Sequence, residues 1–403
     1  MAAWSLYVHI PFCQTRCSYC DFNASAGLEA LIPLYVKSLI NEIHFSAEAI
    51  RELSESDQPG PDPLISTVYF GGGTPSLLPT DLLAEILTNI RQHLGVHPNA
   101  EISLEANPGT LTRNSIIAMR KMGINRLSLG MQSAHAPELS LLGRRHQFTD
   151  VQLAASWARQ AGFENINLDL IFGLPGQTLE AWQRSLTNAL ALQPEHLSLY
   201  ALTLEADTPL GRKVQQGDMP EPDPDLAADM YDYASDELDK IGYEQYEISN
   251  WAKRSPSGEI MSCRHNLQYW RCQPCLGFGA GAHAFVFGMR TENVNSPLEY
   301  IRRMSITGKQ AFAKFPCTPA VTTSRLISPQ ESMGEVMMMG LRLTREGILD
   351  KDFQQRFGQT LQETYPLEIE ELYDLGLLEW DGNRLRLSKQ GRLLGNQVFI
   401  RFI

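Results

Sequence analysis

The segment YVHIPFCQTRCSYC, residues 7–20, contains the pattern that decides the fold. It begins with β-branched and aromatic residues that predict a strand, and it continues with Cys13, Cys17 and Cys20 in a C-x3-C-x2-C spacing. Three thiolates on one short loop can converge on a single cofactor. A structural zinc site closes with a fourth protein ligand, whereas a 4Fe–4S cluster bound by three thiolates keeps one iron open for a small chelating ligand. Buried or zinc-bound cysteines are the alternative, and the rest of the chain favours the cluster because it supplies matching parts.

The composition is that of a globular protein with an acidic balance. The chain has 403 residues, of which 43% are hydrophobic, and this excludes disorder as the main state. With 34 Lys and Arg against 46 Asp and Glu, the net charge of −12 argues against broad nucleic-acid binding, which needs clustered cations. The chain starts without a basic segment before an apolar stretch, and glycines and a proline interrupt the charge-poor run Cys272–Met289. We therefore expect a cytoplasmic protein with reduced cysteines, no signal peptide and no transmembrane segment.

Short β-branched or aromatic runs alternate with longer helical patterns over the first two hundred residues. This alternation predicts βα units and a parallel sheet. Six units are too few for a complete eight-stranded barrel, so we expect an α/β fold with a partial (βα)6 barrel. The predicted strands are Leu6–Ile10, Thr67–Phe70, Ile102–Glu105, Arg126–Leu129, Ile166–Ile171 and Leu197–Ala201, and the predicted helices are Leu34–Leu53, Thr80–Leu94, Arg113–Met122, Asp150–Gln160 and Thr178–Leu192.

The C-terminal part has a different pattern. It predicts helices at Ser328–Leu343, Asp350–Phe357 and Gln362–Leu375, and then a hairpin at Leu378–Leu387, where Asp381-Gly382 is a strong turn pair. Helices followed by a hairpin predict a small helical, winged-helix-like domain. Acidic residues outnumber basic ones there, so a packing or lid role is favoured over DNA binding. We expect two domains, 1–315 with the barrel and its extension, and 323–403.

Polar and glycine-rich residues follow the predicted strands, one strand after another. In βα barrels the carboxyl ends of the strands build the site, so residues recurring there indicate a functional site more strongly than isolated caps or turns would. Consecutive glycines also let the backbone approach a ligand closely. The segments are Gly71-Gly72-Gly73-Thr74-Pro75, Glu105-Ala106-Asn107-Pro108, Gly130-Met131-Gln132-Ser133, and Asp169 with Gly173-Leu174-Pro175-Gly176.

With these parts in place, the chain resembles the radical S-adenosylmethionine superfamily. The resemblance covers most of the chain and is closest to the oxygen-independent coproporphyrinogen III oxidase group. It implies a 4Fe–4S cluster whose open iron chelates S-adenosylmethionine, and one electron from the cluster then releases a 5′-deoxyadenosyl radical. The protein would position this cofactor and exclude water. The matching motifs are YVHIPFC at 7–13, GGGTPS at 71–76, LEANPGT at 104–110, SLGMQS at 128–133 and NLDLIFGLPGQ at 167–177.

The resemblance also implies a set of S-adenosylmethionine-binding residues. Gly73 and Thr74 would hold the methionine end, and the carboxylates and Gln132 would hold amino or ribose hydroxyl groups. Arg144 suits the methionine carboxylate because its guanidinium is planar, although a solvated helix end is the alternative for this residue. The implied set is Tyr7, Tyr19, Gly72, Gly73, Thr74, Glu105, Gln132, Arg144, Asp169 and Ala201.

Two departures from the oxidase motif favour a resemblance to the HemW-type haem chaperones. The oxidase has a further cysteine where this chain has Phe22, and it has a longer segment before the cluster. The sequence HNLQYW at 265–270 also resembles the H-N-x-x-Y-W motif of the chaperones. That motif implies His265 as an axial ligand of haem iron, with flat aromatic surface beside it. A core histidine among packing aromatics is the alternative.

The resemblance therefore implies a chaperone that binds haem, a 4Fe–4S cluster and S-adenosylmethionine. Its partners would be a haem-accepting apo-protein and a reductant that supplies an electron. The alternatives are the coproporphyrinogen III oxidase itself and a radical enzyme with another substrate. Cys263, Cys272 and Cys275 leave a second metal site conceivable, and reduced, unliganded thiols are favoured because no clear fourth ligand is visible.

Overall fold

The computed structural model describes residues 4–55, 64–305 and 315–403. The chain divides into two compact units. The first comprises Met1–Met230 and Pro274–Arg325, and the second comprises Tyr231–Gln273 and Leu326–Ile403. By its contacts, the HNLQYW segment at 265–270 therefore belongs to the second unit, together with the C-terminal residues. The expected division into domains 1–315 and 323–403 stays a prediction.

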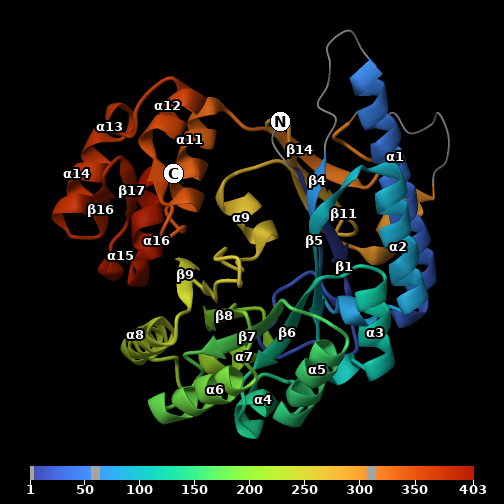
Figure 1. The fold of residues 1–403 in the computed structure, drawn as a ribbon, viewed down its shortest axis with the longest axis horizontal. Coiled ribbons are helices and arrows are strands. Elements are labelled where there is room, and N and C mark those ends of the chain that lie inside the picture. The colour runs from blue at the N-terminus through green and yellow to red at the C-terminus, as the bar shows by residue number, and fades with distance from the viewer. Residues whose placement is uncertain (1–3, 56–63, 306–314) are drawn as a thin grey trace. The chain divides into compact units, whose positions relative to one another are not determined.

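The first unit is built on a largely parallel sheet, and the predicted α/β architecture is confirmed. Its strands follow the order β14-β13-β12-β11-β1-β4-β5-β6-β7-β8, and each pair from β11-β1 to β7-β8 is parallel. Figure 1 shows α1 to α6 arranged around β1 and β4 to β8. The repeating elements are β1 (Trp4–Ile10), α1 (Ile32–Glu55), β4 (Ile65–Gly72), α2 (Thr80–His93), β5 (Val96–Ala106), α3 (Arg113–Lys121), β6 (Arg126–Gln132), α4 (Ala136–Leu141), α5 (Phe148–Gln160), β7 (Ile166–Phe172), α6 (Leu179–Ala191) and β8 (His196–Ala201).

The remaining elements of this unit extend the sheet beyond β1 and cover it. The run Cys272–Met289 forms strands and turns, as its glycines predict. No helix among the described residues is long and apolar enough to span a membrane. The elements are α7 (Pro209–Gln215), β11 (Cys275–Phe278), β12 (His283–Val286), β13 (Met289–Asn293), α10 (Pro297–Met304) and β14 (Val321–Leu326), and α8 (Pro224–Lys240) runs from the first unit into the second.

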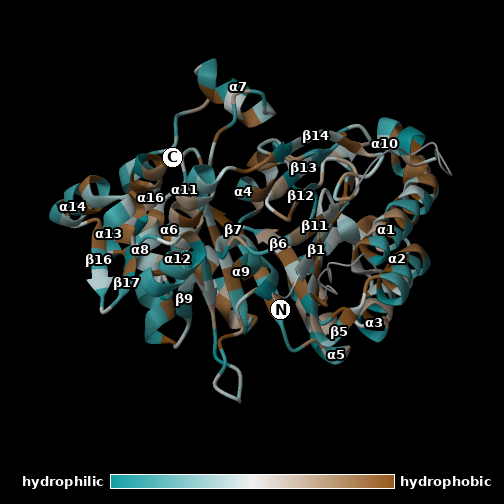
Figure 2. Ribbon diagram, turned by 90° about the horizontal axis from the view of Figure 1, so that it is seen from above, coloured by the Kyte–Doolittle hydropathy of each residue, from teal (hydrophilic) through white to brown (hydrophobic). Residues whose placement is uncertain are grey.

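The barrel strands have one hydrophobic face and one polar face, and both faces are buried. Along β6, Leu127, Leu129 and Met131 alternate with Arg126 and Ser128, all of them buried. Parallel strands normally have hydrophobic residues on both faces. The polar row is therefore an interior surface suited to hydrogen bonding, while the hydrophobic row packs against amphipathic helices such as α1 and α2 (Figure 2). The other buried polar residues of these strands are Ser5, His9, Ser66, Thr67, Glu101, Ser103, Gln132, Asn167, His196 and Ser198.

A fully buried carboxylate on α1 fastens the elements at the β11 side of the sheet. Glu42 accepts hydrogen bonds from the hydroxyls of Tyr300 (2.6 Å) and Thr318 (2.8 Å). It also accepts from the Gly279 N–H and the Asn293 amide, each at 2.9 Å. Burying a carboxylate is costly unless donors replace its water, and these four donors do so. Glu42 therefore holds α1, the turn after β11, β13 and α10 together.

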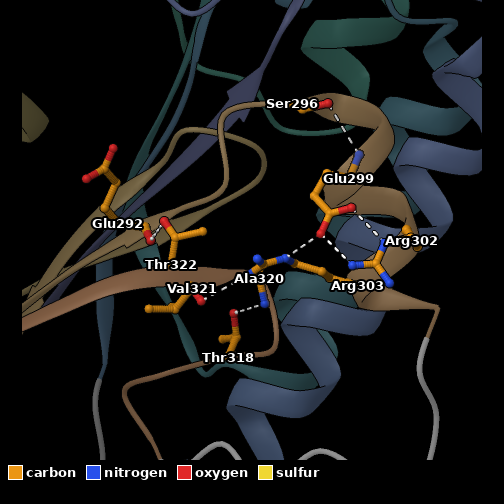
Figure 3. Close-up of polar contacts among 9 residues, drawn as sticks. All are labelled: Glu292, Ser296, Glu299, Arg302, Arg303, Thr318, Ala320, Val321 and Thr322. Atoms are coloured by element: carbon orange, nitrogen blue, oxygen red, sulfur yellow. Dashed lines mark hydrogen bonds and ion pairs between the residues drawn. The ribbon is translucent and has the colours of Figure 1, made fainter.

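Surface contacts fix α10 to the strand that follows it (Figure 3). Ser296 caps the helix by accepting from the Glu299 N–H, and the Glu299 carboxylate accepts from Arg302 and Arg303. Arg303 also donates to the Val321 carbonyl at 3.2 Å. These side chains are partly exposed, so each contact contributes little to stability compared with the Glu42 network.

The second unit combines a short strand pair and α9 with the C-terminal helices and hairpin. Its hairpin is confirmed, but the two residues between β16 and β17 are Gly382 and Asn383, one position after the predicted Asp381-Gly382 pair. Gly382 has a positive φ of 59°. The prediction of one helix at Gln362–Leu375 is wrong. Pro366 has no N–H to continue a helix, and it starts a new one at its first turn. The elements are β9 (Glu244–Glu247), β10 (Asn250–Ala252), α9 (Arg264–Trp270), α11 (Pro329–Gly340), β15 (Ile348–Leu349), α12 (Asp350–Phe357), α13 (Leu361–Thr364), α14 (Pro366–Asp374), β16 (Leu378–Asp381), β17 (Arg384–Leu387), α15 (Lys389–Leu393) and α16 (Gly395–Phe399).

Candidate functional site

The cysteine loop leaves the end of β1 and is held in place by backbone contacts. Its first residues form β2 (Phe12–Cys13), which pairs with β3 (Ser25–Ala26). In the middle of the loop, the Ser18 N–H donates to the Leu142 carbonyl at 3.1 Å. Gly143 has a positive φ of 71°, and a Cβ there would come within 3.0 Å of the Ser18 nitrogen. The segment after α4 therefore approaches the loop as closely as only glycine permits.

The three loop cysteines are free, half-buried thiols that interact electrostatically. Burial raises the pKa of Cys13 and of Cys20, and the neighbouring Cys17 raises both further. Among the described residues no three His, Cys, Asp or Glu side chains are gathered closely enough to hold a metal ion. The structure therefore brings the three thiols to one loop without closing them into a ligand set. Thiolates that repel one another in this way would be stabilised by a bound cationic iron centre.

The glycine triplet after β4 packs directly on the cysteine loop. The Gly73 N–H donates to the Ile10 carbonyl at 2.9 Å, and the Thr74 hydroxyl lies 3.3 Å from the Cys13 sulfur. A Cβ at Gly73 would lie 2.8 Å from the Phe12 carbonyl oxygen and 3.0 Å from the Cys13 sulfur. The triplet is thus more than a plain turn, because any side chain at Gly73 would push the cysteine loop away.

Glu105 lies at the end of β5 and is bound to the same glycine segment. Its carboxylate accepts from the Tyr69 hydroxyl (2.7 Å) and from the Gly72 N–H (3.1 Å). Burial raises the pKa of Glu105 to about 7, although both hydrogen bonds oppose the rise, and the charge of Asp169 adds to it. A carboxyl group with this pKa exchanges its proton near neutral pH.

Asp169 on β7 is held by a chain of hydrogen bonds that runs across three strands. The Asn167 amide donates to Asp169 Oδ1 (2.8 Å) and to the Ser128 hydroxyl (2.7 Å), which itself donates to Asp169 Oδ2 (3.1 Å). The side-chain oxygen Oδ1 of Asn167 accepts hydrogen bonds from His196 Nδ1 (2.6 Å) and from the Ser198 hydroxyl (3.2 Å). Burial lowers the pKa of His196 well below its usual value, so the ring is neutral. Burial also raises the pKa of Asp169.

Arg144 and Tyr19 form a partly buried pair beside the cysteine loop. Arg144 Nη2 donates to the Tyr19 hydroxyl at 2.6 Å, and the guanidinium carbon lies 5.7 Å from the centre of the Tyr19 ring. Burial raises the pKa of Tyr19 to about 12, so this hydroxyl stays protonated. Arg144 Nε is buried and has no acceptor among the described residues. A buried cationic donor without an acceptor suits a carboxylate ligand, and the solvated helix end considered for Arg144 does not describe this burial.

The other residues of the implied set lie on the same strands. The Tyr7 hydroxyl donates to His9 Nδ1 at 2.9 Å, and His9 Nε2 donates to the Asn23 carbonyl in the segment after the cysteines. Gln132 has a positive φ of 62° where the register between β6 and β7 shifts, and such an irregularity turns a side chain away from the regular alternation. Ala201 is exposed at the end of β8.

The sequence patterns missed the residues that support Asp169. Asn167 and Ser128 lie in the motifs at 167–177 and 128–133 but were assigned no role there, and His196 and Ser198 lie outside these motifs. The four residues are spread over three strands. One signal was present. The segments NLDL at 167–170 and HLSL at 196–199 have a polar residue at every second position, which predicts a second, polar face for each strand.

In the second unit, His265 lies on α9 and is buried, with an exposure of 1%. Its ring meets the Tyr269 ring edge-on, with 5.2 Å between the centres. Cys263 and Cys272 flank this helix, and the Cys272 sulfur donates to the Glu335 carbonyl at 3.8 Å. Cys275 lies in β11 of the first unit. Among the described residues, no group of three His, Cys, Asp or Glu side chains gathers around these cysteines.

In a comparison with known protein families, two family models match this chain. Residues 7–188 match the radical SAM superfamily, and residues 327–394 match the HemN C-terminal domain. A protein named heme chaperone HemW from Bacillus subtilis is 36% identical over 402 residues, which cover 99% of each chain. A protein with the same name from Mycobacterium tuberculosis H37Rv is 34% identical over 400 residues, covering 98% of this chain and 93% of the relative.

Two further matches extend the comparison. The mouse protein named radical S-adenosyl methionine domain-containing protein 1, mitochondrial, is 36% identical over 400 residues, covering 96% of this chain and 84% of the relative. The solved structure of coproporphyrinogen III oxidase (HemN) from Escherichia coli superposes with a TM-score of 0.81 at 22% identity, covering 100% of this chain and 90% of the oxidase. At that identity the superposition establishes the fold alone.

Proposed function

Because the chain belongs to the HemW family of radical S-adenosylmethionine proteins, we propose that it is a cytoplasmic haem chaperone that binds haem, a 4Fe–4S cluster and S-adenosylmethionine and passes haem to an acceptor protein. One observation carries the proposal, namely identity of 34–36% along the full length to proteins named heme chaperones. A reductant would supply the electron that the cluster needs. The acceptor is proposed only by class, as an apo-protein that takes up haem.

The cluster would bind to Cys13, Cys17 and Cys20, and S-adenosylmethionine would bind beside it. When bound, the cluster supplies one electron and an open iron site. Arg144 would pair with the methionine carboxylate through its unused Nε donor. The lack of a side chain at Gly73 lets the glycine segment pack against the Cys13 sulfur, so a methionine end bound to this segment would lie beside the cysteine loop.

The polar ends of β5 and β7 would bind the remaining hydroxyl and amino groups of S-adenosylmethionine. Glu105 and Asp169 offer carboxylate oxygens in a partly buried setting, where a hydrogen bond to a ligand is worth more than in water. Asn167 fixes the plane of the Asp169 carboxylate from one side and Ser128 from the other. Tyr7, Tyr19, Gly72, Thr74, Gln132 and Ala201 complete the proposed pocket.

Haem would bind at α9, with His265 as the proposed axial ligand through a neutral imidazole nitrogen. The ring is buried, so ligation requires the surroundings of α9 to open. His265→Ala would remove the ligand and leave only contacts to the porphyrin. We expect a changed Soret spectrum and weaker haem binding with unchanged iron and sulfide content. An unaltered spectrum in this variant would remove His265 from the proposal.

Coproporphyrinogen oxidation is the second candidate, because the solved fold match is to an oxidase. Phe22 argues against it, since this side chain occupies the position of the extra cysteine of the oxidase motif and is 60% exposed. A phenyl ring cannot supply the proton or metal-ligand chemistry of a thiol. Turnover of coproporphyrinogen by the reconstituted protein would support the oxidase instead.

A further inference from the structure

Two buried N–H donors meet at the C-terminal end of α9. The guanidinium carbon of Arg342 lies 4.5 Å from the centre of the Trp270 ring and 5.7 Å from that of Phe399. Neither Trp270 Nε1 nor Arg342 Nε finds an acceptor within the described ranges, although both atoms are buried. Buried donors are almost always paired in folded proteins, so two adjacent exceptions point to a missing acceptor.

The nearest acid does not fill this role. Glu247 is fully buried, and its Oε2 lies 3.9 Å from Arg342 Nη2, beyond hydrogen-bond distance. Its other oxygen, Oε1, already accepts from the Asn250 amide and the Ser249 N–H. The indole N–H and Arg342 Nε therefore stay available to a second carboxylate.

Three other arginines near α9 pair closely with carboxylates, whereas Arg342 Nη2 lies 3.9 Å from Glu247. Arg271, the residue after α9, donates from Nε and Nη2 to the two oxygens of Glu346, at 3.0 and 2.5 Å. Arg254 and Arg345 both pair with Glu244. Arg271 thus offers a control of the same charge, one position away from Trp270, whose donors are already used.

The surroundings of the two donors are hydrophobic. Trp270 and Ile260 pack against a cluster of Tyr246, Leu267 and buried neighbours. A site with hydrophobic surface and two neighbouring N–H donors, one of them cationic, matches a carboxylate carried on a flat apolar body.

We propose that Trp270 and Arg342 bind a propionate carboxylate of haem. This inference rests on the proposed haem function and adds the chemical group that α9 recognises. In this proposal, Trp270 of the HNLQYW segment donates a hydrogen bond from its indole N–H. Trp270 lies five residues after His265, about 140° further round the helix. The carboxylate site is therefore independent of whether His265 ligates the iron.

The test compares haem with haem dimethyl ester, whose propionates cannot accept as carboxylates. Both are titrated into the full-length wild type, Arg342→Gln, Trp270→Phe and the control Arg271→Gln, with folding of each checked by circular dichroism. Two charge-assisted hydrogen bonds predict that the wild type binds haem at least about tenfold more tightly than the ester. Arg342→Gln and Trp270→Phe should each reduce this preference several-fold through weaker haem binding, whereas Arg271→Gln should keep it.

The outcomes separate this inference from the proposed function. Equal wild-type affinity for haem and ester would overturn the propionate site while haem binding stands. An equal loss of the preference for haem over the ester in Arg271→Gln would also overturn the propionate site, because removing any nearby positive charge would then have the same effect. Absence of any haem binding by the wild type would overturn the proposed function itself. Trp270→Phe keeps an aromatic ring at this position and removes only the indole N–H among the polar groups, so it tests the site even if Arg342→Gln does not fold.

Discussion

Replacing Glu105 with glutamine should change how the stability of the protein depends on pH. Burial raises the pKa of Glu105 to about 7 from its ordinary value of 4.5. The glutamine side chain has nearly the same shape and does not titrate. We expect the free energy of unfolding of Glu105→Gln, relative to the wild type, to increase as pH rises from 5 to 8.

The sign follows from proton binding in the two states. Between pH 4.5 and 7 the folded carboxyl group keeps a proton that the unfolded chain has already released. The wild type therefore loses stability as pH rises through this range, and the loss is complete above about pH 7. The two pKa values correspond to roughly 3 kcal/mol, of which about 2 to 3 kcal/mol falls between pH 5 and pH 8. The charge of Asp169 contributes to the raised pKa of Glu105, so the difference between the two proteins includes this coupling.

Urea denaturation of the apo-protein under reducing conditions, at intervals from pH 5 to pH 8, measures this difference. Glu85→Gln, on the exposed side of α2, is the matched control, and its difference from the wild type should stay flat. A flat difference for Glu105→Gln as well would show that the carboxyl group is not desolvated as the structure describes. A difference of the opposite sign would show that Glu105 is held as a stabilised anion.

Three further predictions concern the cluster, the ligand and the fold. Alanine at Cys13, Cys17 or Cys20 should abolish stable cluster binding, and retention of about four irons per chain in all three variants, by iron and sulfide assay after anaerobic reconstitution, would contradict the ligand assignment. Gly73→Val should weaken S-adenosylmethionine binding by displacing the cysteine loop, and unchanged affinity in equilibrium binding would mean that the triplet is only a turn. Glu42→Leu should lower the free energy of unfolding by ~3 kcal/mol or more, because four buried donors lose their acceptor, and a thermal melt within error of the wild type would refute that role.

The sequence predicted the repeating architecture well because each βα unit is encoded locally. Asp350–Phe357 matches α12 at both ends, and the six barrel strands are present with ends that extend a few residues beyond the predictions. Gln362–Leu375 failed because apolar periodicity continues across Pro366, while the helix cannot. Apolar periodicity indicates which face of a segment is buried, and it does not indicate where the helix is interrupted.

The long-range contacts could not be predicted from the chain. Glu42 binds groups more than two hundred residues away in sequence, and nothing around residue 42 indicates that its carboxylate is buried. The left-handed backbone at Gln132 is similarly set by the pairing of β6 with β7. The residues of the cysteine loop and the glycine triplet were predictable, because resemblance to a family preserves which residues meet at the strand ends.

The most direct test of the proposed chaperone function measures haem binding and coproporphyrinogen turnover on the same sample. The wild type is reconstituted anaerobically with iron and sulfide, titrated with haem, and then supplied with S-adenosylmethionine, reductant and coproporphyrinogen. We predict saturable haem binding with a defined Soret spectrum, together with no formation of decarboxylated product. Robust turnover of coproporphyrinogen without saturable haem binding would contradict the chaperone and establish an oxidase.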